Sequence, residues 1–283
     1  MQRLSDIYRP ITASPFTGDK TYREIPPCDA LKPYIRCFWG TELPVTAYDV
    51  LNDDISLVIP DTCIDIIFEI DYTNNRYNGF VCTLDEHSYS ASAVELPAAP
   101  KPIAATFAIR FYAWSAVLFA EHDFRGCRNT AFHVDEFFSG FRRELEPLLF
   151  DVPSLSEKAR IAERFLLGRL HPERLHSDML NALYFMLSNG GRAKVSDICG
   201  YASVSERRLE RLFSSAVGAS PKLFSSLVRY QLLWQDMLFD PRFNILDAVE
   251  KHGYFDQSHL LHDFYSRHLM SPRQAMEFAH RKR

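Results

Sequence analysis

Hydrophobic positions follow two different periods along the chain, and the change falls near residue 150. Before it, short apolar runs rich in β-branched and aromatic residues, at 55–60, 63–70 and 105–112, are typical of strands. The Pro-Asp-Thr sequence at 60–62 supplies turn residues between the first two runs. The pattern therefore predicts an antiparallel β domain, closed or sandwiched.

After residue 151 the apolar positions recur at helical spacing. Five of them predict one face of an amphipathic helix: Leu155, Ala159, Ala162, Leu166 and Leu170. Ser154 or Ser156 is a suitable cap for its start. This helix is either a dimer contact or a lid on the β domain. A second helix is predicted over roughly 177–189, ended by Asn-Gly-Gly at 189–191, and short helices follow it.

These periods predict an α+β protein of two domains. Residues 1–150 form the β-rich domain, residues 151–176 a helical connector, and residues 177–283 an all-α domain.

Composition supports a folded protein. Of 283 residues, 47% are hydrophobic and 24% charged, which excludes disordered and low-complexity classes. No apolar run reaches the ~18 residues of a membrane span, and the first residues lack the features of a signal peptide. Six scattered cysteines without a C-x-x-C motif predict reduced thiols and no disulfide framework. We therefore expect a soluble cytoplasmic protein without a membrane partner.

The net charge of −4 is distributed unevenly. Residues 1–185 hold 18 Lys and Arg against 26 Asp and Glu, whereas residues 186–283 hold 14 against 10. A basic segment beside an acidic one favours nucleic-acid contact, although a charge of this size is also typical of an ordinary solvated surface.

An internal repeat lies in the last third of the chain. Residues 205–213 align with residues 256–264 at an offset of 51, which pairs Leu209 with Leu260 and Phe213 with Phe264. Two copies of one supersecondary unit explain this pattern. Each copy has the layout of a helix-turn-helix: a short helix, a tight turn and a second helix that begins after an N-cap residue, Ser205 or Asp256.

The polar face of each second helix suits contacts with base edges. Arg pairs with guanine acceptors, Gln with adenine, and Leu with a thymine methyl group. The candidate DNA-binding residues are Arg207, Arg208, Glu210 and Arg211 in the first unit and Gln257, Ser258, Leu261 and His262 in the second. The alternative is a solvated face on an ordinary helix hairpin, which two copies with matching polar faces make the weaker interpretation.

The sequence from about 177 to 273 resembles the AraC-type DNA-binding domain. The first half is carried by residues 205–213 and by Gly-Ala-Ser-Pro at 218–221, and the second by residues 253–260 with Phe264 and Ser-Pro at 271–272. The resemblance implies two helix-turn-helix units joined by a long helix at about 221–239. Each unit reads a major-groove segment about one helical turn of DNA from the other.

Among the positions that depart from the family pattern are Ala248 and Val249, where the family has Ile-Ala, and three residues that bear on the turns and on DNA contacts. The family prefers Gly where this chain has Ser203 and Leu269, and a β-carbon in a left-handed conformation costs roughly 1 kcal/mol. His262 stands where a permanently charged Arg or Lys is common, so we expect weaker binding by the second unit.

The N-terminal half resembles sensor domains of the same regulators, through residues 58–68 and 109–114. The resemblance implies a cupin-like β domain that senses a small-molecule effector or dimerises. Five residues are candidates for lining an effector pocket: Asp61, Asp65, Arg110, Tyr112 and Trp114. The alternative is that they are turn and core residues, and this interpretation is favoured because Asp after Pro in a turn needs no ligand to explain it.

No motif predicts an enzyme. The chain has no H-E-x-x-H spacing, no glycine-rich phosphate loop and no G-x-S-x-G sequence, so we expect no catalytic residue, metal or cofactor. Cys63 lies near two aspartates, which raise rather than lower the pKa of a thiol. A cysteine-dependent DNA-repair activator requires four cysteines near the N-terminus, where only Cys28 and Cys37 occur.

The sequence therefore predicts an AraC-type, sequence-specific transcription regulator that binds double-stranded promoter DNA. The resemblance makes RNA polymerase and a second copy of the chain plausible partners. The alternative from a different class is a sensor or adaptor whose helical domain binds protein rather than DNA.

Overall fold

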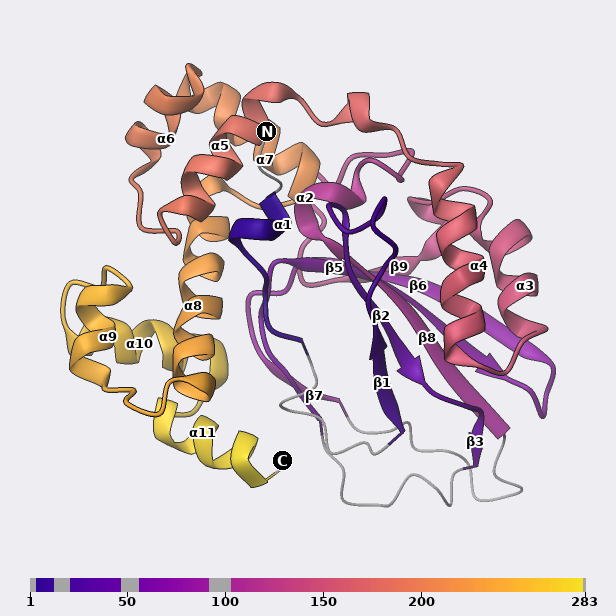
Figure 1. Cartoon of the computed structure of the whole chain (residues 1–283). Coiled ribbons are helices and arrows are strands. Elements are labelled where there is room, and N and C mark those ends of the chain that lie inside the picture. The colour runs from indigo at the N-terminus through magenta and orange to yellow at the C-terminus, as the bar shows by residue number, and fades with distance from the viewer. Residues whose placement is uncertain (1–3, 13–20, 47–55, 92–102, 282–283) are drawn as a thin grey trace.

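The computed structural model describes residues 4–12, 21–46, 56–91 and 103–281. Within them, an antiparallel sheet of seven strands forms the centre of the N-terminal half (Figure 1), in the order β1-β2-β8-β5-β6-β9 with β3 paired to β8. Its strands are β1 (Tyr22–Ile25), β2 (Ile35–Thr41), β3 (Val45–Thr46), β5 (Cys63–Asp71), β6 (Arg76–Cys82), β8 (Ile103–Tyr112) and β9 (Ala131–His133). A separate pair is formed by β4 (Ser56–Val58) and β7 (Tyr89–Ala91). The three predicted strand runs appear as β4, β5 and β8, although Ile55 lies outside the described residues.

The two faces of the sheet have different chemistry. Alternation along β8 places Phe107, Ile109 and Phe111 in the hydrophobic core, whereas Arg110 lies on the opposite face. Helices α3 (Glu146–Phe150) and α4 (Leu155–Leu167) lie along the sheet, as Figure 1 shows, after a π-helical turn at Phe141–Leu145. Four of the five residues of the predicted apolar face are buried in α4, namely Leu155, Ala159, Ala162 and Leu166. The fifth, Leu170, lies beyond the end of the helix and is half-buried. This face packs against its own β domain, as expected of a lid, and the dimer contact stays a prediction.

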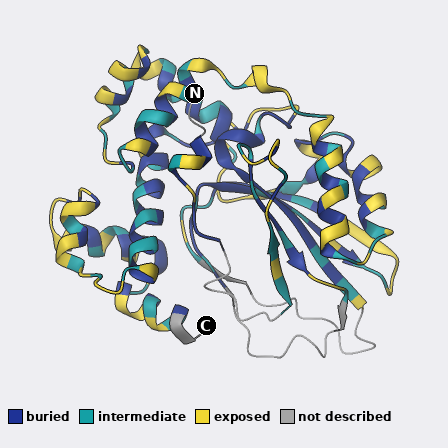
Figure 2. Cartoon of the chain, in the orientation of Figure 1, coloured by how far each residue is buried: buried dark blue, intermediate teal, exposed yellow. Residues whose placement is uncertain are grey.

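The C-terminal half is helical. Its helices are α5 (Ser177–Ser188), α6 (Val195–Ala202), α7 (Glu206–Val217), α8 (Pro221–Phe239), α9 (Ile245–Lys251), α10 (Gln257–His268) and α11 (Pro272–Arg281). The predicted long helix is α8, which is capped by Ser220 and has Pro221 at its first position. It joins the α5–α7 group to the α9–α11 group and is buried along much of its length (Figure 2).

Short elements complete the described chain. They are α1 (Leu4–Ile7), α2 (Ala113–Ala116) and single helical turns at Val134–Glu136 and Pro172–Arg174. None of the described helices has both the length and the apolar composition needed to cross a membrane. All six cysteines lie within the described residues, and none is paired in a disulfide.

The hydrophobic core does not divide at the boundary between the two halves. One cluster runs from the sheet through Trp114 and Phe124 to Leu209 of the first helical group and Phe224 of α8. A second cluster, in the last helical group, includes Ile11, Leu57 and Ile59 of the N-terminal half. The predicted α+β architecture is confirmed, and both helical groups are packed against the N-terminal half.

Candidate nucleic-acid interface and effector site

Helix α7 is the second helix of the first helix-turn-helix unit. The Oγ atom of Ser205 accepts a hydrogen bond from the backbone N–H of Arg208 at 3.3 Å, so the predicted cap is present. Leu209 and Phe213 are fully buried, whereas Arg207 and Arg211 on the opposite face are exposed. Glu210 lies beside them and is half-buried.

Arg208 has an intramolecular partner that the sequence did not indicate. Its Nε–H donates to Oδ2 of Asp178 at 2.6 Å, and its Nη2 lies 3.1 Å from Nε2 of His176. Both partners belong to the start of α5, 30 or more residues earlier in the chain. The ion pair therefore fixes α7 against α5, and Arg208 is less available to a ligand than Arg207 or Arg211.

Helix α10 occupies the same position in the second unit. Asp256 caps it by accepting a hydrogen bond from the backbone N–H of His259 at 2.7 Å, and Leu260 and Phe264 are fully buried. The candidate residues Gln257, Ser258 and His262 are exposed and Leu261 is half-buried. Gln257 and Leu261 also line a mainly apolar hollow of about 410 Å³ between α10 and α11.

The two turns that lack the family's glycine keep the left-handed conformation. Ser203, after α6, has φ of +55°, and Leu269, after α10, has φ of +54° with its side chain exposed. Both residues therefore carry the steric cost of a β-carbon in the left-handed region.

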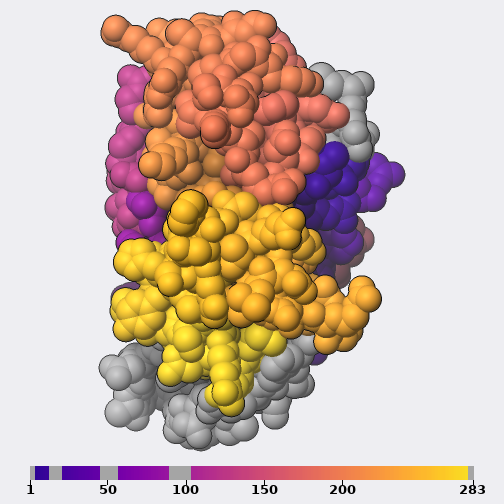
Figure 3. All heavy atoms as spheres, turned by 90° about the vertical axis from the view of Figure 1, so that its left-hand side faces the viewer, coloured from indigo at the N-terminus to yellow at the C-terminus, as the bar shows by residue number. Residues whose placement is uncertain are grey.

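The two units lie one above the other on one face of the molecule (Figure 3), with the N-terminal half visible at their edges. Helix α8 fixes their relative position, because its buried residues contribute to both hydrophobic clusters.

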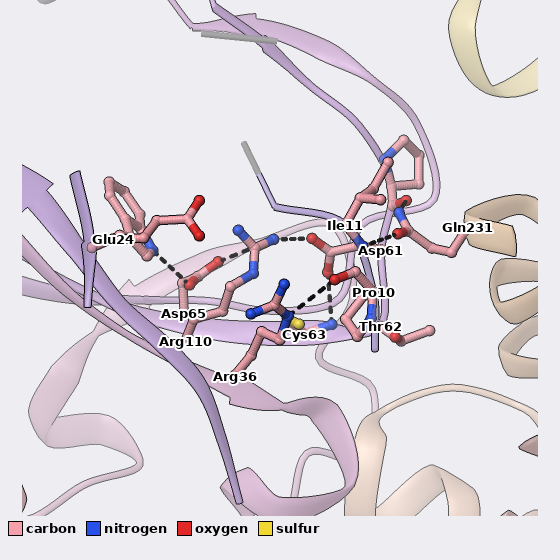
Figure 4. Close-up of polar contacts among 12 residues, drawn as sticks. Pro10, Ile11, Glu24, Arg36, Asp61, Thr62, Cys63, Asp65, Arg110 and Gln231 are labelled. Atoms are coloured by element: carbon pink, nitrogen blue, oxygen red, sulfur yellow. Dashed lines mark hydrogen bonds and ion pairs between the residues drawn. The ribbon is translucent and has the colours of Figure 1, made fainter. Parts of the chain in front are cut away.

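A charged cluster occupies the polar face of the sheet (Figure 4). Strand register places Arg110 of β8 between Cys37 of β2 and Asp65 of β5. The guanidinium of Arg110 forms an ion pair with Asp61 and lies 3.9 Å from a carboxylate oxygen of Asp65. Asp61 in turn accepts a hydrogen bond from the backbone N–H of Cys63 at 2.6 Å. The structure thus brings together three of the five candidate effector residues.

Asp65 is the group in this cluster with a strongly shifted pKa. Burial raises the pKa of its carboxyl to about 7, although the hydrogen bond that Trp39 Nε1 donates to Oδ1 at 3.0 Å favours the charged form. Through this hydrogen bond Trp39 of β2 extends the cluster, and Glu24 of β1 lies nearby (Figure 4). Within the described part of the chain, the Nε–H of Arg110 is buried without a hydrogen-bond partner. An unpaired buried donor of this kind is the feature that a polar ligand would satisfy.

The other two candidates, Tyr112 and Trp114, lie in the hydrophobic core. Their rings stack with centroids 4.8 Å apart, and Trp114 meets Phe224 of α8 edge-on at 6.2 Å. They pack the sheet against α8 and do not line the charged cluster.

Two further features bear on metal and thiol chemistry. Burial and the nearby Asp65 carboxylate raise the pKa of the Cys63 thiol, as expected from its neighbours. Among the described residues, no group of three His, Cys, Asp or Glu side chains is placed to hold a metal ion.

Gln231 links the charged cluster to α8 and was not predicted. Its Nε2 donates to the carbonyl of Pro60 at 2.6 Å, and its Oε1 accepts from the backbone N–H of Ile11 at 2.9 Å (Figure 4). The sequence held one signal for it. Gln231 is an amide at a position of the predicted helix that otherwise belongs to its apolar face, between Leu227 and Trp234.

The two capped helix-turn-helix units joined by α8 have the arrangement that the AraC-type resemblance implies. A helix-turn-helix domain of this kind supports a DNA-binding transcription regulator. Residues 198–277 match a family model described as a helix-turn-helix domain, and residues 23–132 match one described as a domain of unknown function (DUF6597). Comparison with curated proteins gives no match.

Solved structures of ToxT from Vibrio cholerae show a distant likeness. One has 9% identity and a TM-score of 0.42, covering 92% of this chain and 99% of that chain. ToxT with a bound unsaturated fatty acid has 9% identity and a TM-score of 0.38, covering 84% and 93%. ToxT bound to (E)-4-(8-methylnaphthalen-1-yl)but-3-enoic acid has 11% identity and a TM-score of 0.41, covering 92% and 100%. Likenesses this distant carry no information on the ligand or DNA site of the present chain.

Proposed function

We propose that this chain regulates transcription by sequence-specific binding to promoter DNA through α7 and α10. The observation that carries the proposal is the repeated arrangement of two capped helices, each with a buried Leu-Phe pair and an exposed polar face. In this proposal Arg207, Glu210 and Arg211 read one major-groove segment, and Gln257, Ser258, Leu261 and His262 read the next. Arg208 is assigned a positioning role, because Asp178 engages its guanidinium.

The test is selection of preferred duplexes from random DNA by the whole chain. The whole chain is required because Ile11, Leu57 and Ile59 complete the core of the second unit, and an isolated fragment from residue 177 would expose that surface. We expect enrichment of two short conserved segments with centres about one helical turn, roughly 10 base pairs, apart. Binding of the selected duplex should fall steeply with salt, because phosphate contacts release counterions. A protein-binding adaptor would enrich no sequence.

We further propose that a polar small molecule at the cluster of Asp61, Asp65 and Arg110 controls DNA binding. The unpaired Nε–H of Arg110 and the Gln231 bridge from Pro60 to α8 support this assignment. A polar ligand at this cluster should raise the thermal unfolding midpoint of the wild type. It should leave that of Arg110→Lys unchanged, because lysine lacks the forked donors of a guanidinium. An equal shift in both proteins would place the ligand elsewhere.

The resemblance also supports an intracellular regulator that contacts RNA polymerase, either as a monomer or as a homodimer. We propose that residues 1–150, 151–176 and 177–283 divide these tasks into sensing, connecting and DNA binding.

A further inference from the structure

A hollow of about 380 Å³ lies where the N-terminal half meets the first DNA-binding unit. It is lined on one side by residues of α7, including Arg211, and on the other by the loop after α2 and by Arg174 of the connector. The charged and titratable residues around it are Glu121, His122, Asp123, Arg125, Arg174 and Arg211.

The arginines of this hollow are available to a ligand. The side chains of Arg174 and Arg211 are exposed, and Arg174 has an electrostatic interaction with the exposed carboxylate of its neighbour Glu173. Arg125 pairs with Asp123 at 3.1 Å, but the two side chains are 60% and 43% exposed. An exposed pair of this kind contributes little free energy, so a phosphate can replace the carboxylate at small cost.

The loop that carries Arg125 is held firmly against α7. The backbone N–H of Phe124 donates to the carbonyl of Ser215 at 2.9 Å, and the fully buried Phe124 ring stacks on Phe137 with centroids 5.1 Å apart. The loop and the end of α7 are in close contact, since a β-carbon on Gly218 would lie 2.7 Å from the carbonyl oxygen of Cys127. Arg125 therefore has a defined position beside the recognition helix.

We propose that Arg125 and Arg174 bind the backbone phosphates of the same duplex whose bases Arg211 reads. The N-terminal half is then part of the DNA interface as well as a sensor. This inference rests on the proposed function of α7. Phosphates line both rims of the major groove that a recognition helix enters, and guanidinium groups are well suited to bind them. Glu121, which lines the same hollow, repels the phosphates and lowers the affinity for DNA.

The test is a salt titration of DNA binding by the whole chain, on the selected duplex and on a scrambled one. Arg174→Ala should weaken binding to both duplexes about three- to tenfold at low salt and reduce the slope of log K against log salt by about 1. Arg125→Ala should act in the same direction. Glu121→Gln should strengthen binding to both duplexes, because it removes a negative charge from the rim.

Arg160→Ala is the matched control, since Arg160 is an exposed arginine on α4 that does not line the hollow. It should leave affinity and slope unchanged, and circular dichroism should show every variant folded. Suppose that binding of the wild type to the selected duplex falls steeply with salt, and that Arg125→Ala and Arg174→Ala both have the wild-type slope of log K against log salt. This inference is then wrong and the proposed function stands. If Arg174→Ala loses affinity for the selected duplex alone, Arg174 reads a base and the phosphate assignment is wrong. If the wild type shows no DNA binding that falls steeply with salt concentration, the proposed function itself is wrong.

Discussion

Single residues set the ends and the exposed faces of α7 and α10. Ser205 and Asp256 cap α7 and α10, as their positions before the repeated Leu and Phe residues predicted. Capping was predictable because it depends on atoms within three residues of one another. The partner of Arg208 was not, because Asp178 lies 30 residues away and only the tertiary fold brings it close.

Leu269 is the residue whose replacement should stabilise the protein. Its φ of +54° places a β-carbon in the left-handed region, and its side chain is 78% exposed. Leu269→Gly should therefore raise the free energy of unfolding by about 1 kcal/mol, measured by urea denaturation. Leu269→Ala keeps the β-carbon and serves as the control. An equal gain in both variants would mean that the exposed leucine side chain, rather than the backbone, was unfavourable.

Arg211 should carry sequence discrimination. We expect Arg211→Ala to lose about 1–3 kcal/mol of discrimination at one or two base pairs of the selected site, because a bidentate contact to a base is removed. Competition binding with single-base variants of the site measures this loss. A uniform loss on every duplex would make Arg211 a phosphate contact instead.

At the scale of elements, α8 determines how the parts of the molecule are arranged. It contributes Phe224, Leu227 and Val228 to the first cluster and Leu233, Trp234 and Met237 to the second. Its side-chain amides also hold the N-terminal segment, through Gln231 to Ile11 and through Gln235 to the carbonyl of Arg9 at 2.6 Å.

Gln231→Leu should lower the free energy of unfolding by about 1–3 kcal/mol, because it leaves the buried N–H of Ile11 and the carbonyl of Pro60 without partners. Urea denaturation of the whole chain measures this change. Gln235→Leu is the matched control. Its bond is exposed, so water can replace the lost amide and the loss should be smaller. Equal losses in the two variants would show that burial of the Gln231 bridge does not matter.

Elements with a strong local pattern were predictable from the sequence. The strands β5 and β8 and the helix α4 follow from apolar periodicity, and α7 and α10 follow from the internal repeat and its N-cap residues. The long helix α8 was expected from the family resemblance. The order of strands and the docking of the helical groups were not predictable, because they depend on contacts between distant segments. Of the five candidate effector residues, Asp61, Asp65 and Arg110 lie together in the charged cluster, whereas Tyr112 and Trp114 are core residues; their role in effector binding stays a prediction. The local sequence could not separate these two groups, because an aromatic residue near a charged one has the same pattern whether it lines a pocket or packs in the core.

At the scale of the whole molecule, the second unit is held against the N-terminal half by contacts at the end of α10. The backbone N–H of Ser88 donates to the carbonyl of Arg267 at 2.8 Å, and Ser88 Oγ lies 2.8 Å from Nδ1 of His268. The Nε1–H of Trp234 donates to Nε2 of His268 at 3.0 Å, and the hydroxyl of Tyr230 also contacts that nitrogen. Because an indole N–H can only donate, Nε2 is an acceptor and His268 is neutral with its proton on Nδ1.

Acid should weaken this contact. Burial, together with the charge of Arg267, lowers the pKa of His268 from 6.5 to about 3. Between these values the unfolded state binds a proton that the folded state does not, so stability falls as the pH decreases. We expect a contribution of up to about 1.4 kcal/mol per pH unit in this window.

Urea denaturation from pH 7 to pH 4 measures this dependence. His268→Asn provides the comparison, since asparagine can keep a hydrogen bond to Ser88 but does not titrate. The difference in slope between wild type and variant isolates His268 from other histidines, including His252, whose pKa is also lowered by burial. Identical slopes would show that His268 is not the group responsible.

The placement of Ile11, Leu57 and Ile59 within the core of the last three helices limits how this regulator can be re-engineered. Fusing the helical domain to a foreign sensor domain would separate those three side chains from the residues they pack against. It would leave exposed apolar surface on both parts. A working hybrid would have to include β4 with Ile59 and the N-terminal segment with Ile11 along with the helices, so an exchange of parts in this protein must follow its packing and not only the order of domains along the chain.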